Sequence, residues 1–159
     1  MLKNLVVYPE TDVVKLNFMD IQPIVNDQFN EVIDLLNRNN LPTSDITRET
    51  KLFVMTDQNK IIGSIGLEIK KNMGLLRSLS VDDKYRNKGS AISLVNYLED
   101  FARELHLDSI YLLTTTAEQF FTKRKYKVID RNTIPDEIRD TSEFQSVCPA
   151  SAVVMKKHL

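Results

Sequence analysis

One short stretch, YRNKGSA at residues 85–91, brings together residue types that bind anions. Arg86 and Lys88 supply positive charge, and Gly89 is one of only four glycines in the 159-residue chain. The apolar spacing that follows predicts a helix beginning at Gly89, and the first N–H groups of a helix carry the positive end of its dipole. Because glycine has no Cβ, a phosphate could approach this backbone closely, so the stretch indicates a pyrophosphate-binding turn.

Counting glycines excludes two familiar phosphate-binding loops. A dinucleotide fingerprint requires three spaced glycines at this turn, and only Gly89 is present. A P-loop requires two glycines followed by Lys and Ser or Thr, which this chain also lacks. The pattern that remains is Arg-x-x-Gly-x-Ala, formed by Arg86, Gly89 and Ala91, and taken alone it fits an ordinary basic loop equally well.

Strands and helices must alternate around this turn to position it. The predicted elements are strands within 5–21 and at 51–56, 61–69, 75–81, 109–116, 126–130 and 150–157, and helices at 26–40, 89–105 and 117–125. A hairpin then feeds a strand–helix–strand crossover, which demands a parallel strand pair. We therefore expect an α/β (α+β) fold, one domain over residues 1–159 with a mixed central sheet flanked by helices.

Composition narrows the class of partner. A net charge of −1 and a pI near 6.1 give no basic surface for nucleic acid. Cys148 is the only cysteine, which excludes an internal disulfide, and with two histidines the chain has no metal-site spacing. No targeting segment and no membrane-spanning apolar run is visible, so we expect a cytoplasmic protein without metal or membrane.

Two motifs in this setting resemble the GNAT acetyltransferase superfamily. RNKGSA resembles motif A, which binds the pyrophosphate of acetyl-CoA, and TTTAEQFFTKRKYKVIDR resembles the helix with an aromatic pair that follows the parallel strand. More narrowly, LPTSD, GLLRSLSV, YLLTTTAEQFF and EFQSVCPASAVVMKK resemble the GNAT family associated with bacterial arsenic-resistance operons. IPDEIR and CPASAVVM are distantly similar to the amino-acid N-acetyltransferases that make N-acetylglutamate.

The resemblance implies that strands 75–81 and 109–116 splay apart to admit acetyl-CoA as cosubstrate. Pantetheine would pair with the backbone of Leu79 and Val81, and Thr114 would take the position of a pantetheine-binding Asn. The cofactor-binding residues implied in this way are Leu79, Ser80, Val81, Arg86, Asn87, Lys88, Gly89, Ser90, Ala91, Thr114 and Phe120.

The resemblance also implies that an amine attacks the thioester directly, with the carbonyl polarised by a strand N–H near Leu79. Two family features are missing, because Phe121 fills the position of the usual acid Tyr and residues 73–81 contain no carboxylate. Glu68 is the nearest candidate base, although an exposed structural carboxylate fits it equally. Catalysis by positioning alone is a further option, since orientation contributes roughly 7–11 kcal/mol.

The missing base favours an amine that is already partly neutral. The α-amine of an amino acid has a pKa of roughly 7.7–8.0, against about 10.4 for lysine. Its carboxylate would need a positive partner, and Arg77 suits bidentate recognition. We therefore predict N-acetylation of a small amino acid or analogue, with Arg77, Ser78 and Thr115 as acceptor-binding residues.

Several alternatives stay open at this point. A non-catalytic CoA-binding regulatory module would explain the missing Tyr and carboxylate, and a protein or peptide N-acetyltransferase would need an open groove. An acyl-enzyme on Cys148 is disfavoured, because a lone cysteine without a histidine neighbour more often packs. A homodimer is compatible with the sequence, which does not name the acceptor.

Overall fold

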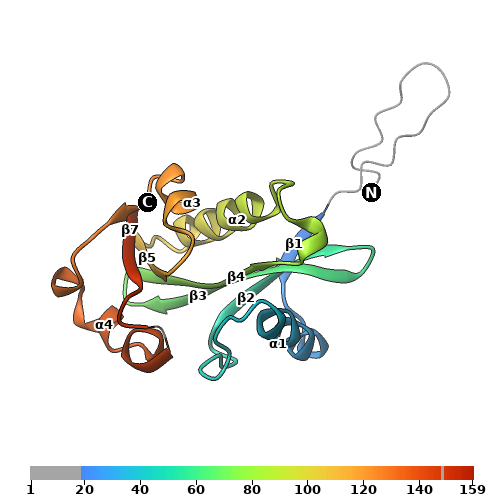
Figure 1. Cartoon of the computed structure of the whole chain (residues 1–159), viewed down its shortest axis with the longest axis horizontal. Helices are drawn as coiled ribbons and strands as arrows, with labels where there is room; N and C mark the ends of the chain where they lie inside the picture. The colour runs from blue at the N-terminus through green and yellow to red at the C-terminus, as the bar shows by residue number, and fades with distance from the viewer. Residues whose placement is uncertain (1–18, 148) are drawn as a thin grey trace, which may run out of the picture.

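The structure is a computed structural model that describes residues 19–147 and 149–159 (Figure 1). Most of the earliest predicted strand and Cys148 lie outside the described residues. The strands are β1 (Asp20–Pro23), β2 (Lys51–Asp57), β3 (Lys60–Lys70), β4 (Met73–Val81), β5 (Ser109–Thr114), β6 (Lys127–Val128) and β7 (Val153–His158). The helices are α1 (Phe29–Arg38), α2 (Ser90–Glu104), α3 (Glu118–Lys123) and α4 (Asp136–Arg139).

The strands form one seven-stranded sheet in the order β1-β2-β3-β4-β5-β7-β6. All neighbouring pairs are antiparallel except β4 and β5, which are joined by α2 and run parallel. The predicted mixed sheet with one parallel pair is therefore confirmed, and its strand–helix–strand connection is the crossover that the sequence demands.

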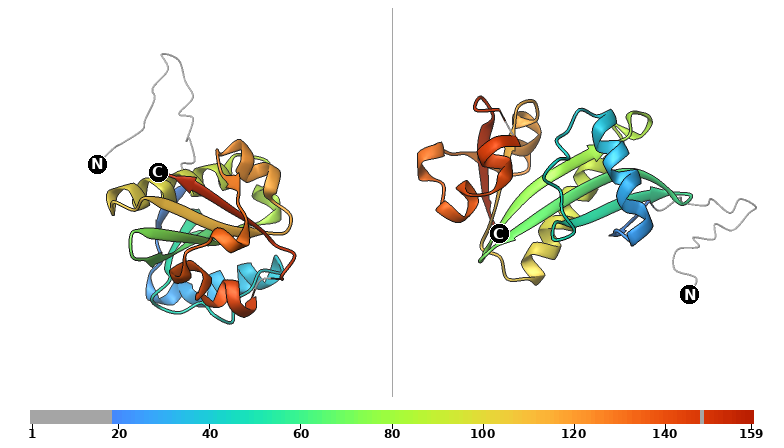
Figure 2. Two further views of the ribbon diagram at one scale, coloured as in Figure 1. Left: turned by 90° about the vertical axis from the view of Figure 1, so that its left-hand side faces the viewer. Right: turned by 90° about the horizontal axis from the view of Figure 1, so that it is seen from below.

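The two longer helices, α1 and α2, cover opposite faces of the sheet (Figure 1, Figure 2). In β2, Leu52 and Val54 pack with side chains of α1, whereas Phe53 and Met55 pack with those of α2. Successive side chains of a strand point to opposite faces, so this unbroken apolar run is buried on both sides.

The parallel pair is joined only at one end. β4 and β5 pair at three positions, Met73 with Ser109, Gly74 with Ile110 and Leu75 with Tyr111. Beyond Leu75 the two strands diverge, β4 to Val81 and β5 to Thr114, while β5 stays paired with β7 along its whole length. The expected splayed pair is thus present and opens toward the N-terminus of α2.

The segment between β6 and β7, for which no element was predicted, contains helical structure. It forms α4 and then a single π-helical turn, Glu143–Val147. Ile134 and Ile138 anchor it on β5 and β7, on the face opposite α2. No helix in the described part of the chain is long and apolar enough to cross a membrane.

Candidate active site

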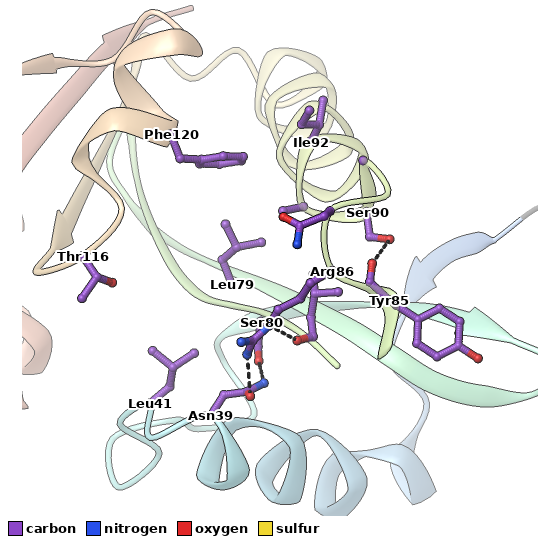
Figure 3. Close-up of a pocket in the computed structure, with 14 residues that line it drawn as sticks. Asn39, Leu41, Leu79, Ser80, Tyr85, Arg86, Ser90, Ile92, Thr116 and Phe120 are labelled. Carbon is purple, nitrogen blue, oxygen red and sulfur yellow. Dashed lines mark hydrogen bonds between the residues drawn. The ribbon is translucent and has the colours of Figure 1, made fainter. Parts of the chain in front are cut away.

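A cavity of about 760 Å³ lies between the start of α2 and the end of β4 (Figure 3). We call it the α2 cavity. Of the predicted cofactor-binding residues, those that line it are Leu79, Ser80, Val81, Arg86, Asn87, Gly89, Ser90, Ala91 and Phe120. Ser90 Oγ donates to the carbonyl of Tyr85 at 3.3 Å, which closes the turn before the helix.

Gly89 gives this turn its shape. It is the N-cap of α2 with φ at +82°, a left-handed conformation that costs other residues energy. A Cβ added at Gly89 would meet no atom within 4 Å, so the backbone here faces open space. The arrangement fits a pyrophosphate, because unpartnered N–H groups at a helix start and room for close approach coincide.

Arg86 is held by the end of α1 at the edge of this cavity (Figure 3). Its Nη2 donates to Asn39 Oδ1 at 2.8 Å, and its Nε donates to the Val81 carbonyl at 3.1 Å. Asn39 in turn donates to Ser80 Oγ, and Asp83 pairs with Arg86 Nη1 at 2.8 Å. A helix far away in sequence therefore orients the arginine of the predicted anion site.

A bulge at Ser78 shapes the other wall. The pairing of β3 with β4 shifts between Ser64 and Gly66, and Ser78 has φ at +56°, which residues other than glycine rarely adopt. The fully buried Ser64 donates its Oγ hydrogen to the Ser78 carbonyl at 2.9 Å and so fixes the bulge. Leu79 follows directly and lines two cavities at once.

The second of these cavities, of about 430 Å³, lies in the opening between β4 and β5. We call it the gap cavity. Its walls include the predicted acceptor-binding residues Arg77, Ser78 and Thr115, and also Phe121 and Glu143. It shares Leu41, Leu79 and Thr116 with the α2 cavity, so the two spaces adjoin.

Arg77 lines this cavity but does not present a free guanidinium to it, and its role as the contact for an acceptor carboxylate stays a prediction. Its Nη1 and Nη2 donate to both carboxylate oxygens of Asp45 at 2.6 Å, and Nη1 also donates to Glu68 at 2.6 Å. Its Nε lies 4.0 Å from Glu143 Oε2, and the side chain is 1% exposed. Three carboxylates of the chain therefore already surround this arginine.

Burial alone would lower the pKa of Arg77, but the hydrogen bonds and charges of its three acidic partners raise that pKa above its ordinary value. Arg77 therefore stays charged. Glu68, the predicted base, is one of these partners and lines a separate acidic cavity of about 260 Å³ together with Asp45. Neither the α2 cavity nor the gap cavity includes Glu68 among its lining residues.

Two further predicted residues are placed differently from the rest. Lys88 does not line the α2 cavity, and its Nζ lies 5.7 Å from the centroid of the Tyr85 ring. Thr114 lines the gap cavity, and its hydroxyl oxygen accepts the N–H of Ala117 at 2.9 Å at the start of α3. Thr114 therefore organises the turn into that helix.

Three of the four described tyrosines are engaged elsewhere and are not placed to supply the missing acid. Tyr126 is buried against Phe121 and donates its hydroxyl to Glu99 at 3.0 Å, and burial followed by the charge of Glu99 raises its pKa. Tyr85 lines the α2 cavity but donates its hydroxyl to Asp57 at 2.9 Å, which raises its pKa, and its ring points away from the other lining side chains (Figure 3). Tyr111 is buried beneath Lys156, so it packs, as expected.

The sequence reasoning missed Asn39, Asp45 and Glu143. Asp45 ends the LPTSD motif and Glu143 begins EFQSV, and both motifs were recognised without a role for either carboxylate. Asn39 carried no signal, because nothing in a local pattern links the end of α1 to Arg86, 47 residues later.

A splayed parallel strand pair, a bulge beside it and a glycine-capped helix start define the class of protein, a CoA-dependent acyltransferase. Residues 18–127 match the Acetyltransferase (GNAT) family, and the chain belongs to that family. The predicted family is therefore confirmed, and the cosubstrate of such an enzyme is acetyl-CoA.

The chain is similar to acetyltransferases of known name, by sequence in one case and by fold in another. The chain is 26% identical over 76 residues to an amino-acid acetyltransferase of Buchnera aphidicola subsp. Acyrthosiphon pisum, covering 48% of this chain and 17% of the relative. It resembles the N-acetylglutamate synthase of Neisseria gonorrhoeae, solved with coenzyme A and L-arginine, with a TM-score of 0.75 and 15% identity over 89% of this chain and 33% of that one.

A GNAT acetyltransferase of Staphylococcus aureus Mu50 matches over nearly its whole length. Its TM-score is 0.70 at 19% identity, covering 89% of this chain and 99% of that one. The predicted distant similarity to amino-acid acetyltransferases is thus supported, although the chain spans only a small part of those relatives. The narrower placement in the arsenic-resistance family stays a prediction.

Proposed function

We propose that this chain transfers the acetyl group of acetyl-CoA to the amine of a small amino acid or amino-acid analogue. The α2 cavity is the proposed site of acetyl-CoA and the gap cavity that of the acceptor. The observation that carries this proposal is the shared wall, in which Leu41, Leu79 and Thr116 line both spaces. Two substrates bound on either side of Leu79 would meet at the bulge of β4.

Acetyl-CoA supplies the thioester, and the chain supplies the binding groups. The N–H groups from Asn87 to Ala91 would hold the pyrophosphate, with Arg86 beside them. Backbone at Leu79 would polarise the thioester carbonyl, a position that the bulge and its bond from Ser64 keep fixed.

The proposed transfer is direct. The neutral amine attacks the carbonyl carbon, a C–N bond forms as the C–S bond breaks, and the amine proton ends on the CoA thiol. Phe121 and Tyr126 supply no acid here, since the first lacks a hydroxyl and the hydroxyl of the second bonds Glu99. Positioning of the two substrates, worth roughly 7–11 kcal/mol, is therefore the main proposed contribution.

The dimensions of the gap cavity favour a small acceptor over a peptide. Its volume of about 430 Å³ lies within the range of small-molecule sites. The amino-acid acetyltransferase relative supports the same chemical class. Amino-acid analogues that contain arsenic or phosphorus belong to this class, in line with the resemblance to the arsenic-resistance family.

The test is a screen of acetyl-CoA consumption over amino acids, their arsenic- and phosphorus-containing analogues, simple amines and short peptides. Released CoA thiol gives the rate, and mass spectrometry of the product locates the acetyl group on nitrogen. We expect turnover of a small amino acid or analogue. Acetyl-CoA binding without any turnover would instead identify a regulatory module, and turnover of peptides alone would identify a peptide acetyltransferase.

A further inference from the structure

We propose that Glu143 accepts a hydrogen bond from the amino group of the acceptor, and that the gap cavity selects acceptors without net negative charge. This inference rests on the proposed function, because it concerns the same acceptor site. It reverses the charge preference that the sequence suggested, since the acidic side chain rather than the arginine becomes the contact for the substrate.

The first observation is the charge on the cavity walls. Among the described residues that line the gap cavity, only Arg77 and Glu143 carry ionisable side chains, and the rest are apolar groups, hydroxyls and one amide. Glu143 lies in the π-helical turn before β7, and its side chain is 9% exposed. A carboxylate at this depth gives the amino group of an entering acceptor a hydrogen-bond partner that water would otherwise supply.

The second observation is that the positive charge of Arg77 is already balanced within the chain. Asp45 takes both of its terminal nitrogens, Glu68 takes the second hydrogen of Nη1, and Glu143 lies 4.0 Å from Nε. Three carboxylates thus face one guanidinium, and their side chains are at most 16% exposed. Charges in such surroundings are poorly screened, so a substrate with one more carboxylate than its amide counterpart would be bound less well.

The third observation is where Glu143 comes from. The family match ends at residue 127, whereas Glu143 belongs to the segment between α4 and β7. Ile138 and Phe144 anchor this segment on the sheet around Tyr111 and Val154, so the carboxylate is carried by a packed element. Acceptor preference would then be set by a part of this chain outside the family's shared core.

The experiment measures kcat/KM for three matched acceptor pairs: glutamine with glutamate, asparagine with aspartate, and alaninamide with alanine. Each pair is nearly isosteric and differs by one negative charge. We expect wild-type protein to prefer the less acidic member of each pair by about tenfold or more. This comparison needs no variant, so it decides the charge preference by itself.

Variants then assign the preference to Glu143. Glu143→Gln should raise KM for the preferred acceptor about tenfold and leave KM for acetyl-CoA within about twofold of the wild-type value. The ratio of kcat/KM between the two members of each acceptor pair should fall to within about threefold of one. Glu143→Asp should keep the ratio. Glu137→Gln is the matched control, because Glu137 is a surface carboxylate of the same segment paired with Lys71.

Equal or better use of the acidic acceptors by wild-type protein would overturn the inference while leaving the proposed function intact. An unchanged pair ratio in a folded Glu143→Gln variant, checked by its acetyl-CoA affinity, would also overturn it. Acetylation of none of the six acceptors, with acetyl-CoA still bound, would overturn the inference, and the proposed function is overturned as well only if the wider screen of amino acids and analogues also gives no turnover.

Discussion

Replacing Gly89 with Asp or Asn separates the charge of the anion site from its backbone geometry. Both side chains have the same shape, and both residue types tolerate the left-handed φ of +82° better than other non-glycine residues. Because an added Cβ meets nothing within 4 Å, neither substitution should disturb the packing. The two variants therefore differ by one negative charge beside the first N–H groups of α2.

The expected effect on stability is opposite to the effect on binding. Either substitution costs at most about 1–2 kcal/mol of backbone strain. The Asp variant should be at least as stable as the Asn variant, because a carboxylate at a helix N-terminus interacts favourably with the dipole. Two unit charges about 4 Å apart repel by about 1 kcal/mol in water and about 4 kcal/mol near a protein surface. In this open cavity we expect about 1.4 kcal/mol, or about tenfold weaker acetyl-CoA binding for Asp than for Asn.

Titration calorimetry with acetyl-CoA measures this difference, and thermal unfolding of both variants provides the control for folding. The ratio of the two dissociation constants should shrink between about 0.01 M and about 1 M salt, since the Debye screening length falls from about 30 Å to about 3 Å. Equal affinities of the Asp and Asn variants at low salt would refute the assignment of the pyrophosphate to the start of α2.

Three further outcomes follow from contacts around the cavities. Asn39→Ala should raise KM for acetyl-CoA by about threefold to tenfold with little change in kcat, because Arg86 Nη2 loses the oxygen that accepts its hydrogen bond. Asn39→Asp keeps an acceptor oxygen, so it should largely restore that KM in steady-state kinetics. Ser64→Ala should lower kcat and cost about 1 kcal/mol of unfolding free energy in urea, because the bulge at Ser78 loses its hydrogen bond. Because the pKa of Tyr126 is raised in the folded state, its contribution to stability is complete below the ordinary value of 10.0 and is lost above it, where the unfolded chain releases the proton first. The urea midpoint of the wild-type protein should therefore fall as pH rises above 10.0, and the midpoint of Tyr126→Phe should fall less.

Local patterns were sufficient to predict most of the fold. The unbroken apolar run of β2 and the apolar stripe of α2 determine which faces are buried, and both elements begin and end within a residue or two of the expected positions. The strand–helix–strand order required a parallel pair, and β4 with β5 provides it. The π-helical turn after α4 was not predictable, because its apolar anchors pack on strands that are distant in sequence.

The same distinction applies to the site. Gly89 could be placed from sequence because its role depends on the local turn and on the helix that follows. Arg77 could also be placed at the cavity, but its chemistry could not be predicted from its strand position. Its partners lie 32 residues before it, in Asp45, and 9 residues before it, in Glu68. The alternation of residues along a strand predicts the face on which a side chain lies. It does not predict which charged residues of other elements will contact that side chain.

This explains why the charge preference proposed for the acceptor site differs from the one predicted from the sequence. An arginine on the wall of a site suggests an anionic substrate only while its charge is unbalanced, and a buried arginine almost always has acidic partners. In this chain those partners outnumber it, so the net charge around Arg77 is negative while its hydrogen bonds are nearly complete. The carboxylate proposed to contact the acceptor, Glu143, comes from the segment before β7 and lines the gap cavity. The substrate charge that such a site prefers depends on the summed charges of the arginine and its acidic partners. Only the folded structure shows which residues belong to that cluster.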